Sequence, residues 1–108
     1  MSIERRKYRR TPIVTEIECS RSGGSFVLLT RDISVGGLFL HTKENFPHET
    51  DLQLRFYLDE KTLIEAEGRI VYTVAGLGVG VEFTDLPKSQ REALESFIAT
   101  SVRASGPI

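Results

Sequence analysis

Alternating apolar and polar positions between residues 13 and 84 predict a succession of short β-strands. In the first, Ile13, Ile17 and Cys19 share one face, with the two-residue period of a strand that has one buried side. Further stretches rich in strand-forming residues follow at 26–33, 38–42, 52–58, 62–74 and 78–83. Turn signals and a loop at 43–50 separate them. We expect the longest strand to bend at Gly68, where a missing side chain permits a bulge.

The period of the pattern changes after residue 84. One helical face is marked by apolar residues at helical spacing: Leu94, Phe97, Ile98 and Val102. We assign the helix to residues 85–104, with Asp85 as its N-cap or, alternatively, a capping box formed by Ser89 and Glu92. Six strands followed by one helix predict a mainly β fold. We expect a six-stranded antiparallel β-barrel with a C-terminal α-helix over an open end or side.

Length and composition indicate one folded domain. The chain has 108 residues, 40% of them hydrophobic, and a formal net charge of −1. These values fit a single domain and exclude a disordered chain. The predicted parts are a flexible basic N-terminal arm at 1–12, a barrel at 13–84 and a helix at 85–104, all within that domain.

Several classes of function are disfavoured by the residues present. The lone cysteine, Cys19, is expected in the core, and neither His41 nor His48 has a second ligand at metal-binding spacing. No familiar catalytic motif occurs, and no apolar run is long enough to cross a bilayer. We therefore expect a cytoplasmic protein that is not an enzyme and carries neither a cofactor nor a metal.

Charge is distributed unevenly along the chain. Residues 1–10 hold five basic side chains against one acidic one, whereas residues 11–108 hold nine basic and 14 acidic side chains. The basic run Arg5-Arg6-Lys7-Tyr8-Arg9-Arg10 is open to two interpretations: a basic tail without a defined ligand, or a ligand clamp. Arginine outnumbers lysine four to one, which favours the clamp, because guanidinium groups bind phosphates and purine edges bidentately.

A second candidate segment is Asp32-Ile33-Ser34-Val35-Gly36-Gly37. If the segment is an ordinary hairpin, its Asp and Ser side chains stabilise the turn through local hydrogen bonds, and its glycines supply positive φ angles. As a ligand site, Asp32 could accept two N–H donors from a guanine Watson–Crick edge and Ser34 could donate to a ligand oxygen. Gly36 and Gly37 would then let the backbone approach a flat ring. Glu65 and Glu67 share a strand face, which we interpret as solvated rather than catalytic.

In order and spacing, the two segments resemble the PilZ domain, a bacterial receptor module for cyclic di-GMP. The first fits R-x-x-x-R and the second fits [D/N]-x-S-x-x-G, with no departure from either motif. The run Gly78-Val79-Gly80-Val81-Glu82-Phe83 is similar to the final strand of that family. The helix from Pro87 is similar to the C-terminal helix of the family. The resemblance covers nearly the whole chain and implies the same barrel-and-helix fold.

The resemblance also implies roles for individual residues. Arg6 and Arg10 would be the motif arginines that bind phosphates and guanine Hoogsteen edges. Arg5 and Arg9 offer an alternative register, or further contacts to the nucleotide. Asp32 and Ser34 would hold one guanine, and Gly37 would keep the binding surface open.

The favoured function is a stand-alone receptor that binds cyclic di-GMP, orders its arm and changes a surface read by an unidentified downstream protein. The first alternative is a protein-interaction adaptor with the same fold and no dependence on nucleotide. A barrel that binds DNA or RNA is disfavoured, because the body is acidic and offers few stacking aromatics.

Overall fold

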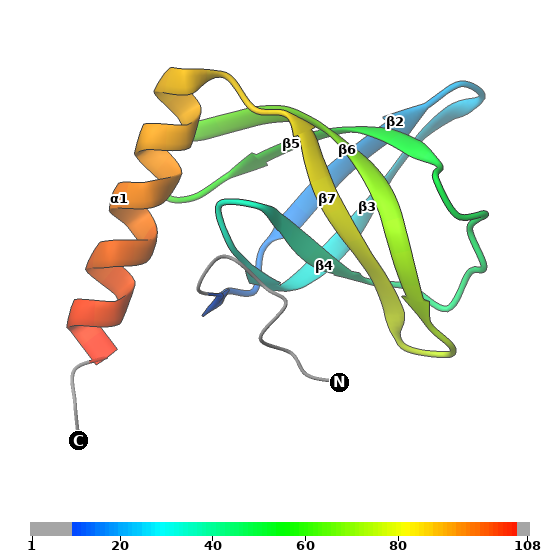
Figure 1. The fold of residues 1–108 in the computed structure, drawn as a ribbon, viewed down its shortest axis with the longest axis horizontal. Coiled ribbons are helices and arrows are strands. Elements are labelled where there is room, and N and C mark those ends of the chain that lie inside the picture. Colours follow the sequence, from blue (N-terminus) through cyan, green and yellow to red (C-terminus); the bar gives the residue numbers. More distant parts are fainter. Residues whose placement is uncertain (1–9, 106–108) are drawn as a thin grey trace.

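Antiparallel pairing of neighbouring strands closes the chain into a barrel in the computed structural model, which describes residues 10–105 (Figure 1). The strands are β1 (Thr11–Pro12), β2 (Glu16–Arg21), β3 (Gly24–Ile33), β4 (Gly37–His41), β5 (Asp51–Tyr57), β6 (Leu63–Val74) and β7 (Gly78–Asp85). The ring runs β3-β2-β5-β6-β7-β4, and the pairing of β3 with β4 closes it. The two-residue β1 adds to the edge of β3. The predicted six-stranded antiparallel barrel is confirmed.

The first predicted strand, expected from Ile13, begins later in the structure, and a short strand that was not predicted precedes it. Its regular part, β2, begins at Glu16, while Thr11 and Pro12 form β1 and pair with Ile33 and Asp32. The intervening residues still follow β3, because Ile13 N donates to the carbonyl oxygen of Arg31 at 3.2 Å. Val14 is 80% exposed, as its outward place in the alternation predicts, so the pattern gives no sign that the regular strand begins only at Glu16.

The predicted bend in the longest strand is also present. In β6, the pairing with β7 shifts register between Glu67 and Gly68. A second shift lies between Ile70 and Tyr72, and the sequence pattern did not indicate it. Both irregularities increase the coiling that a small barrel needs in order to close.

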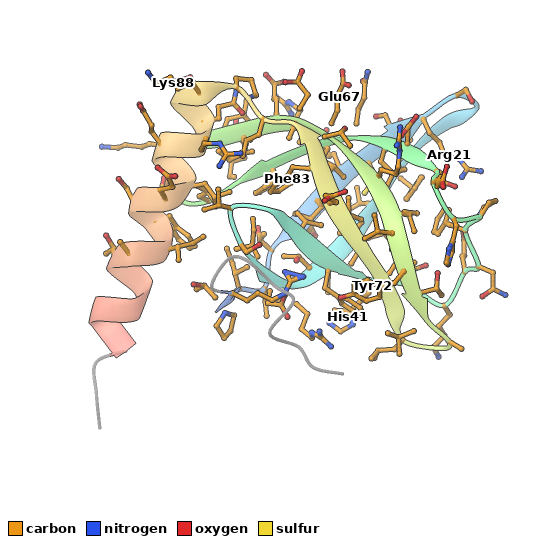
Figure 2. The ribbon with its side chains drawn as sticks, viewed as in Figure 1. Arg21, His41, Glu67, Tyr72, Phe83 and Lys88 are labelled. Carbon is orange, nitrogen blue, oxygen red and sulfur yellow. The ribbon has the colours of Figure 1, made fainter. Side chains whose placement is uncertain are left out.

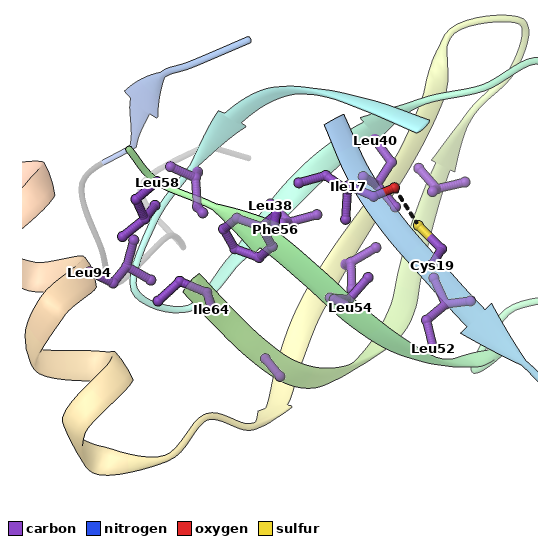
Figure 3. Packing of buried hydrophobic residues seen from close by; sticks show 14 of the residues in the cluster. Ile17, Cys19, Leu38, Leu40, Leu52, Leu54, Phe56, Leu58, Ile64 and Leu94 are labelled. Atoms are coloured by element: carbon purple, nitrogen blue, oxygen red, sulfur yellow. Dashed lines mark hydrogen bonds between the residues drawn. The ribbon is translucent and has the colours of Figure 1, made fainter. Parts of the chain in front are cut away.

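Inward-facing side chains of all six barrel strands form the core. Alternate positions of β2 and β5 are buried, and Cys19 is fully buried, as its place in the pattern predicts. Figure 3 shows Cys19 with its Sγ 3.6 Å from the carbonyl oxygen of Ile17. Glu65 and Glu67 are exposed on the outer face of β6, in agreement with a solvated strand face.

The helix α1 (Lys88–Ser105) covers one end of the barrel (Figure 1). Leu94 is fully buried, and Figure 3 places it at the end of the core that holds Leu58 and Ile64. Gln90 fixes the first turn by accepting a hydrogen bond from the backbone N–H of Glu65.

The predicted N-cap of this helix is wrong. Asp85 is the last residue of β7 and pairs with Glu67, so its backbone is committed to the sheet. The carbonyl oxygen of Pro87 instead accepts the first helical hydrogen bonds, from Gln90 N and Arg91 N. The alternative cap, Ser89, lies inside the helix.

Replacing Leu94 by alanine should loosen the helix from the barrel. The change leaves a cavity at a fully buried position, so we expect the free energy of unfolding to fall by about 2–5 kcal/mol. Chemical denaturation measures this value. The matched control is Glu95→Ala on the exposed face of the same helical turn, which should change stability by less than about 0.5 kcal/mol. Equal losses in the two variants would show that α1 does not pack through Leu94.

The Cys19 thiol should be protected in the folded protein. Burial raises its pKa to about 12, and only the thiolate attacks disulfide reagents. We expect negligible reaction with Ellman's reagent at about pH 8, and one equivalent after unfolding in guanidinium chloride. Because the folded-state pKa is raised, the contribution of the protonated thiol to stability is complete below pH 9.0 and is lost as the pH rises toward about 12. Rapid labelling without denaturant would contradict the buried position.

Candidate functional site

Strand register brings the two candidate segments together at one end of β3. Pro12 of β1 lies opposite Asp32 of β3, so the residue before β1, Arg10, is held beside the Asp32 carboxylate. The Arg10 Nε atom lies 3.3 Å from Asp32 Oδ1, and both side chains are about five-sixths buried, at 15% and 16% exposed. Two residues separated by more than twenty positions in sequence therefore form one ion pair.

The contact between Arg10 and Asp32 is an ion pair without a well-aligned hydrogen bond. Arg10 Nε and Asp32 Oδ1 are both shielded from solvent, and neither has a hydrogen-bond partner within the described part of the chain. An unsatisfied buried donor and acceptor are costly, whereas each can form strong charge-assisted hydrogen bonds. Arg10 Nε can therefore still donate a hydrogen bond, and Asp32 Oδ1 can still accept one.

The other oxygen of the carboxylate is occupied by a residue that the sequence analysis missed. Arg31 Nε donates to Asp32 Oδ2 at 3.0 Å. Its guanidinium carbon lies 4.0 Å from the ring centroid of Phe39, within cation–π range. The available signal was an arginine directly before the D-x-S-x-x-G motif, on the same strand as the motif aspartate.

Ser34 organises the turn that follows Asp32. Its Oγ accepts hydrogen bonds from Gly36 N at 3.1 Å and from Gly37 N at 3.2 Å, and the side chain is 96% buried. The backbone N–H of Ser34 also donates to the carbonyl oxygen of Gly37 at 2.8 Å. Ser34 thus performs the hairpin role considered above, and its contact with a ligand stays a prediction.

The two glycines of this turn lie against β7. The carbonyl oxygen of Gly36 accepts a hydrogen bond from Phe83 N at 2.8 Å, and Gly37 pairs with Glu82. A Cβ atom on Gly37 would collide with the carbonyl oxygen of Val81, so glycine is required there by the close approach of β4 and β7. This constraint is independent of any ligand.

The remaining arginines of the first motif, Arg5, Arg6 and Arg9, lie outside the described residues. Of the predicted site residues, the structure therefore brings together Arg10, Asp32 and the Ser34–Gly37 turn.

One surface hollow, of about 580 Å³, lies away from the candidate site and has Arg21, Asp51 and Arg69 in its lining. The candidate site itself is described by its charged groups. Within residues 10–105, no cluster of three metal-ligating side chains is found, and no helix has the length and apolarity needed to span a membrane.

Comparison with known proteins decides the family. The sequence profile of the PilZ domain matches residues 4–100. The chain belongs to the PilZ domain family. The resemblance inferred from the two motifs is therefore confirmed, and a comparison with curated proteins found no match.

Solved PilZ structures share the fold of this chain at low sequence identity. The PilZ domain with c-di-GMP of YcgR from Escherichia coli aligns with a TM-score of 0.76 at 11% identity, covering 94% of both chains. The inhibitor of motility MotI/DgrA from Bacillus subtilis aligns with a TM-score of 0.78 at 20% identity, covering 98% of this chain and 55% of that one. The K. pneumonia MrkH–c-di-GMP complex gives a TM-score of 0.78 at 17% identity, covering 95% and 55%. This PilZ chain thus spans about half the length of two of these proteins.

Replacing Ser34 by alanine should destabilise the turn even when no ligand is bound. Two backbone N–H groups lose their acceptor at a 96% buried position, so we expect a loss of about 1–3 kcal/mol in the free energy of unfolding. Urea denaturation followed by circular dichroism measures it. Ser25→Ala, at an exposed position of β3, is the control and should change stability by under about 0.5 kcal/mol. A stability loss no greater than that of the control would contradict the assigned role of the hydroxyl.

Proposed function

We propose that this PilZ domain is a receptor for cyclic di-GMP without catalytic activity. The observation that carries the proposal is the ion pair between Arg10 and Asp32, which joins the two family motifs at one place on the barrel. Two solved structures with the same fold, those of YcgR and MrkH, contain this nucleotide. The chemistry of the paired groups is suited to the same ligand.

Cyclic di-GMP offers a separate partner to each member of the pair. Its phosphates and guanine Hoogsteen edges accept hydrogen bonds, which suits the guanidinium of Arg10. Its guanine Watson–Crick edge presents two N–H donors, which suits the carboxylate of Asp32. The nucleotide would therefore exchange one imperfect contact, between Nε and Oδ1, for charge-assisted hydrogen bonds on both sides.

Signal transmission would follow from the position of Arg10 at the end of the basic arm. In this mechanism, phosphate binding by Arg6 and Arg10 folds the arm over the nucleotide. Ordering costs about 1–2 kcal/mol per residue, so the contacts of several arginines are needed to offset it. The folded arm then changes the surface that a downstream protein reads.

Calorimetric titration of the whole chain with cyclic di-GMP tests the proposal. We expect saturable binding that weakens as sodium chloride is raised, because charge pairs carry much of the affinity. The Arg6→Ala, Arg10→Ala double variant and the Asp32→Ala variant should each bind at least about tenfold more weakly, since each removes hydrogen bonds to charged groups.

A second ion pair supplies the matched control. Arg69 and Asp51 form an exposed pair on β6 and β5, with Nε 3.0 Å from Oδ1. Asp51→Ala removes the same charge as Asp32→Ala, and Arg69→Ala removes one of the two charges lost in the Arg6, Arg10 double variant. Each should leave affinity within about twofold. Absence of binding by the unaltered chain would defeat the proposal and favour the nucleotide-independent adaptor.

A further inference from the structure

Arg31 occupies an irregular position that points its side chain toward the site. Along β3 and β4 the register passes from Thr30 opposite Leu40 to Asp32 opposite Phe39, so Arg31 is the extra residue of a β-bulge. Bulges are frequent beside functional sites, where they redirect a side chain. The buried hydroxyl of Thr30 lies 2.7 Å from the carbonyl oxygen of Phe39 and 3.1 Å from that of Asp32, and it holds the bulge from within.

The aromatic ring under Arg31 is unusually well fixed for an outward-facing residue. Phe39 alternates with the core residues Leu38 and Leu40, yet it is fully buried. Its ring lies in the space left by Gly78, because a Cβ atom there would meet two of its ring carbons. The ring is held rigidly, so it gives the guanidinium of Arg31 a firm support.

Two neighbouring aromatic groups complete the packing around Phe39. The His41 ring meets it edge-on, with centroids 5.8 Å apart, and the Tyr72 ring lies 6.3 Å away. Figure 2 shows His41 and Tyr72 on the same side of the barrel.

Arg31 thereby determines how Arg10 meets the carboxylate of Asp32. A guanidinium that faces a free carboxylate tends to bind both oxygens bidentately. Here Arg31 holds Oδ2 at 3.0 Å, and Arg10 approaches only Oδ1, at 3.3 Å and without a well-aligned hydrogen bond. Asp32 is consequently fixed in orientation and is not closed off by Arg10.

We propose that Arg31 is a positioning residue that makes Asp32 selective for guanine over adenine. This inference rests on the proposed receptor function. A carboxylate fixed by Arg31 accepts N1–H and the amino group of guanine together. The corresponding edge of adenine carries one amino donor beside an acceptor nitrogen, and that nitrogen repels the second oxygen. Without Arg31, the carboxylate can turn to Arg10, and both affinity and selectivity fall.

The test compares cyclic di-GMP with cyclic di-AMP by calorimetry on the whole chain. Arg31→Gln should weaken cyclic di-GMP binding about tenfold while changing cyclic di-AMP binding by less than about threefold, so that the preference for guanine narrows. Arg31→Lys keeps the charge and one donor, and it should restore affinity to within about threefold of the unaltered protein. If Arg31→Gln folds poorly, Arg31→Met takes its place, because it retains the aliphatic stem over Phe39. The expected changes in affinity are the same.

Arg21 provides the matched control. Its guanidinium carbon also lies over an aromatic ring, 5.3 Å from the centroid of Phe46, and Figure 2 shows it far from His41 and Tyr72. Arg21→Gln should leave both affinities within about twofold, because it removes the same charge away from Asp32.

A double-variant cycle separates positioning from a general structural effect. Asn also fits the family motif, so Asp32→Asn should retain measurable binding. In that background Arg31→Gln should change affinity by less than about twofold, because the carboxylate through which Arg31 acts is gone. An equal loss in both backgrounds, or an unchanged guanine preference in Arg31→Gln, overturns the inference while binding by the unaltered chain still supports the receptor function.

Discussion

Closure of the barrel depends on the pairing of β3 with β4, and the candidate site depends on the same pairing. β3 contributes one edge to β1 and β2 and the other edge to β4. This ten-residue strand meets its three partners with a bulge at Arg31, directly before Asp32. The same irregularity aims an arginine at the carboxylate on which the proposed recognition relies.

Two guanidinium groups neutralise the one carboxylate at this site and leave a net positive charge in the absence of a ligand. Asp32 is shared by Arg10 and Arg31, and its two oxygens meet different guanidinium groups. Leaving a carboxylate alone at 16% exposure would carry a large desolvation cost. The pairing offsets that cost, and its imperfect half, toward Arg10, is the half that the nucleotide would replace under the proposed function.

Most of the fold was predictable because its signals are local. Alternation along β2 and β5, the glycine and serine at the first turn, and the helical spacing of Leu94 and Ile98 each depend on neighbouring residues. The short strand β1 and the bulge at Arg31 were not predictable, since both arise from pairing with distant strands. The motif residues Asp32 and Ser34 were found from their type and spacing. Phe39 was missed, because an outward position on a strand gives no sign that Gly78 on β7 has made room for its ring.

The short strand β1 connects the candidate site on β3 with the helix α1. β1 touches both β3 and α1, and Pro12 has no N–H to contribute to the ladder. Such a strand is held by few hydrogen bonds, so we expect it to detach at a smaller free energy than the longer barrel strands. Displacement of Arg10 would move the adjacent residues Thr11 and Pro12 of β1. Because β1 contacts α1, that movement would also reach the helix. Under the proposed function, ligand binding at the Asp32 carboxylate would in this way alter how firmly a helix 18 residues long rests on the barrel.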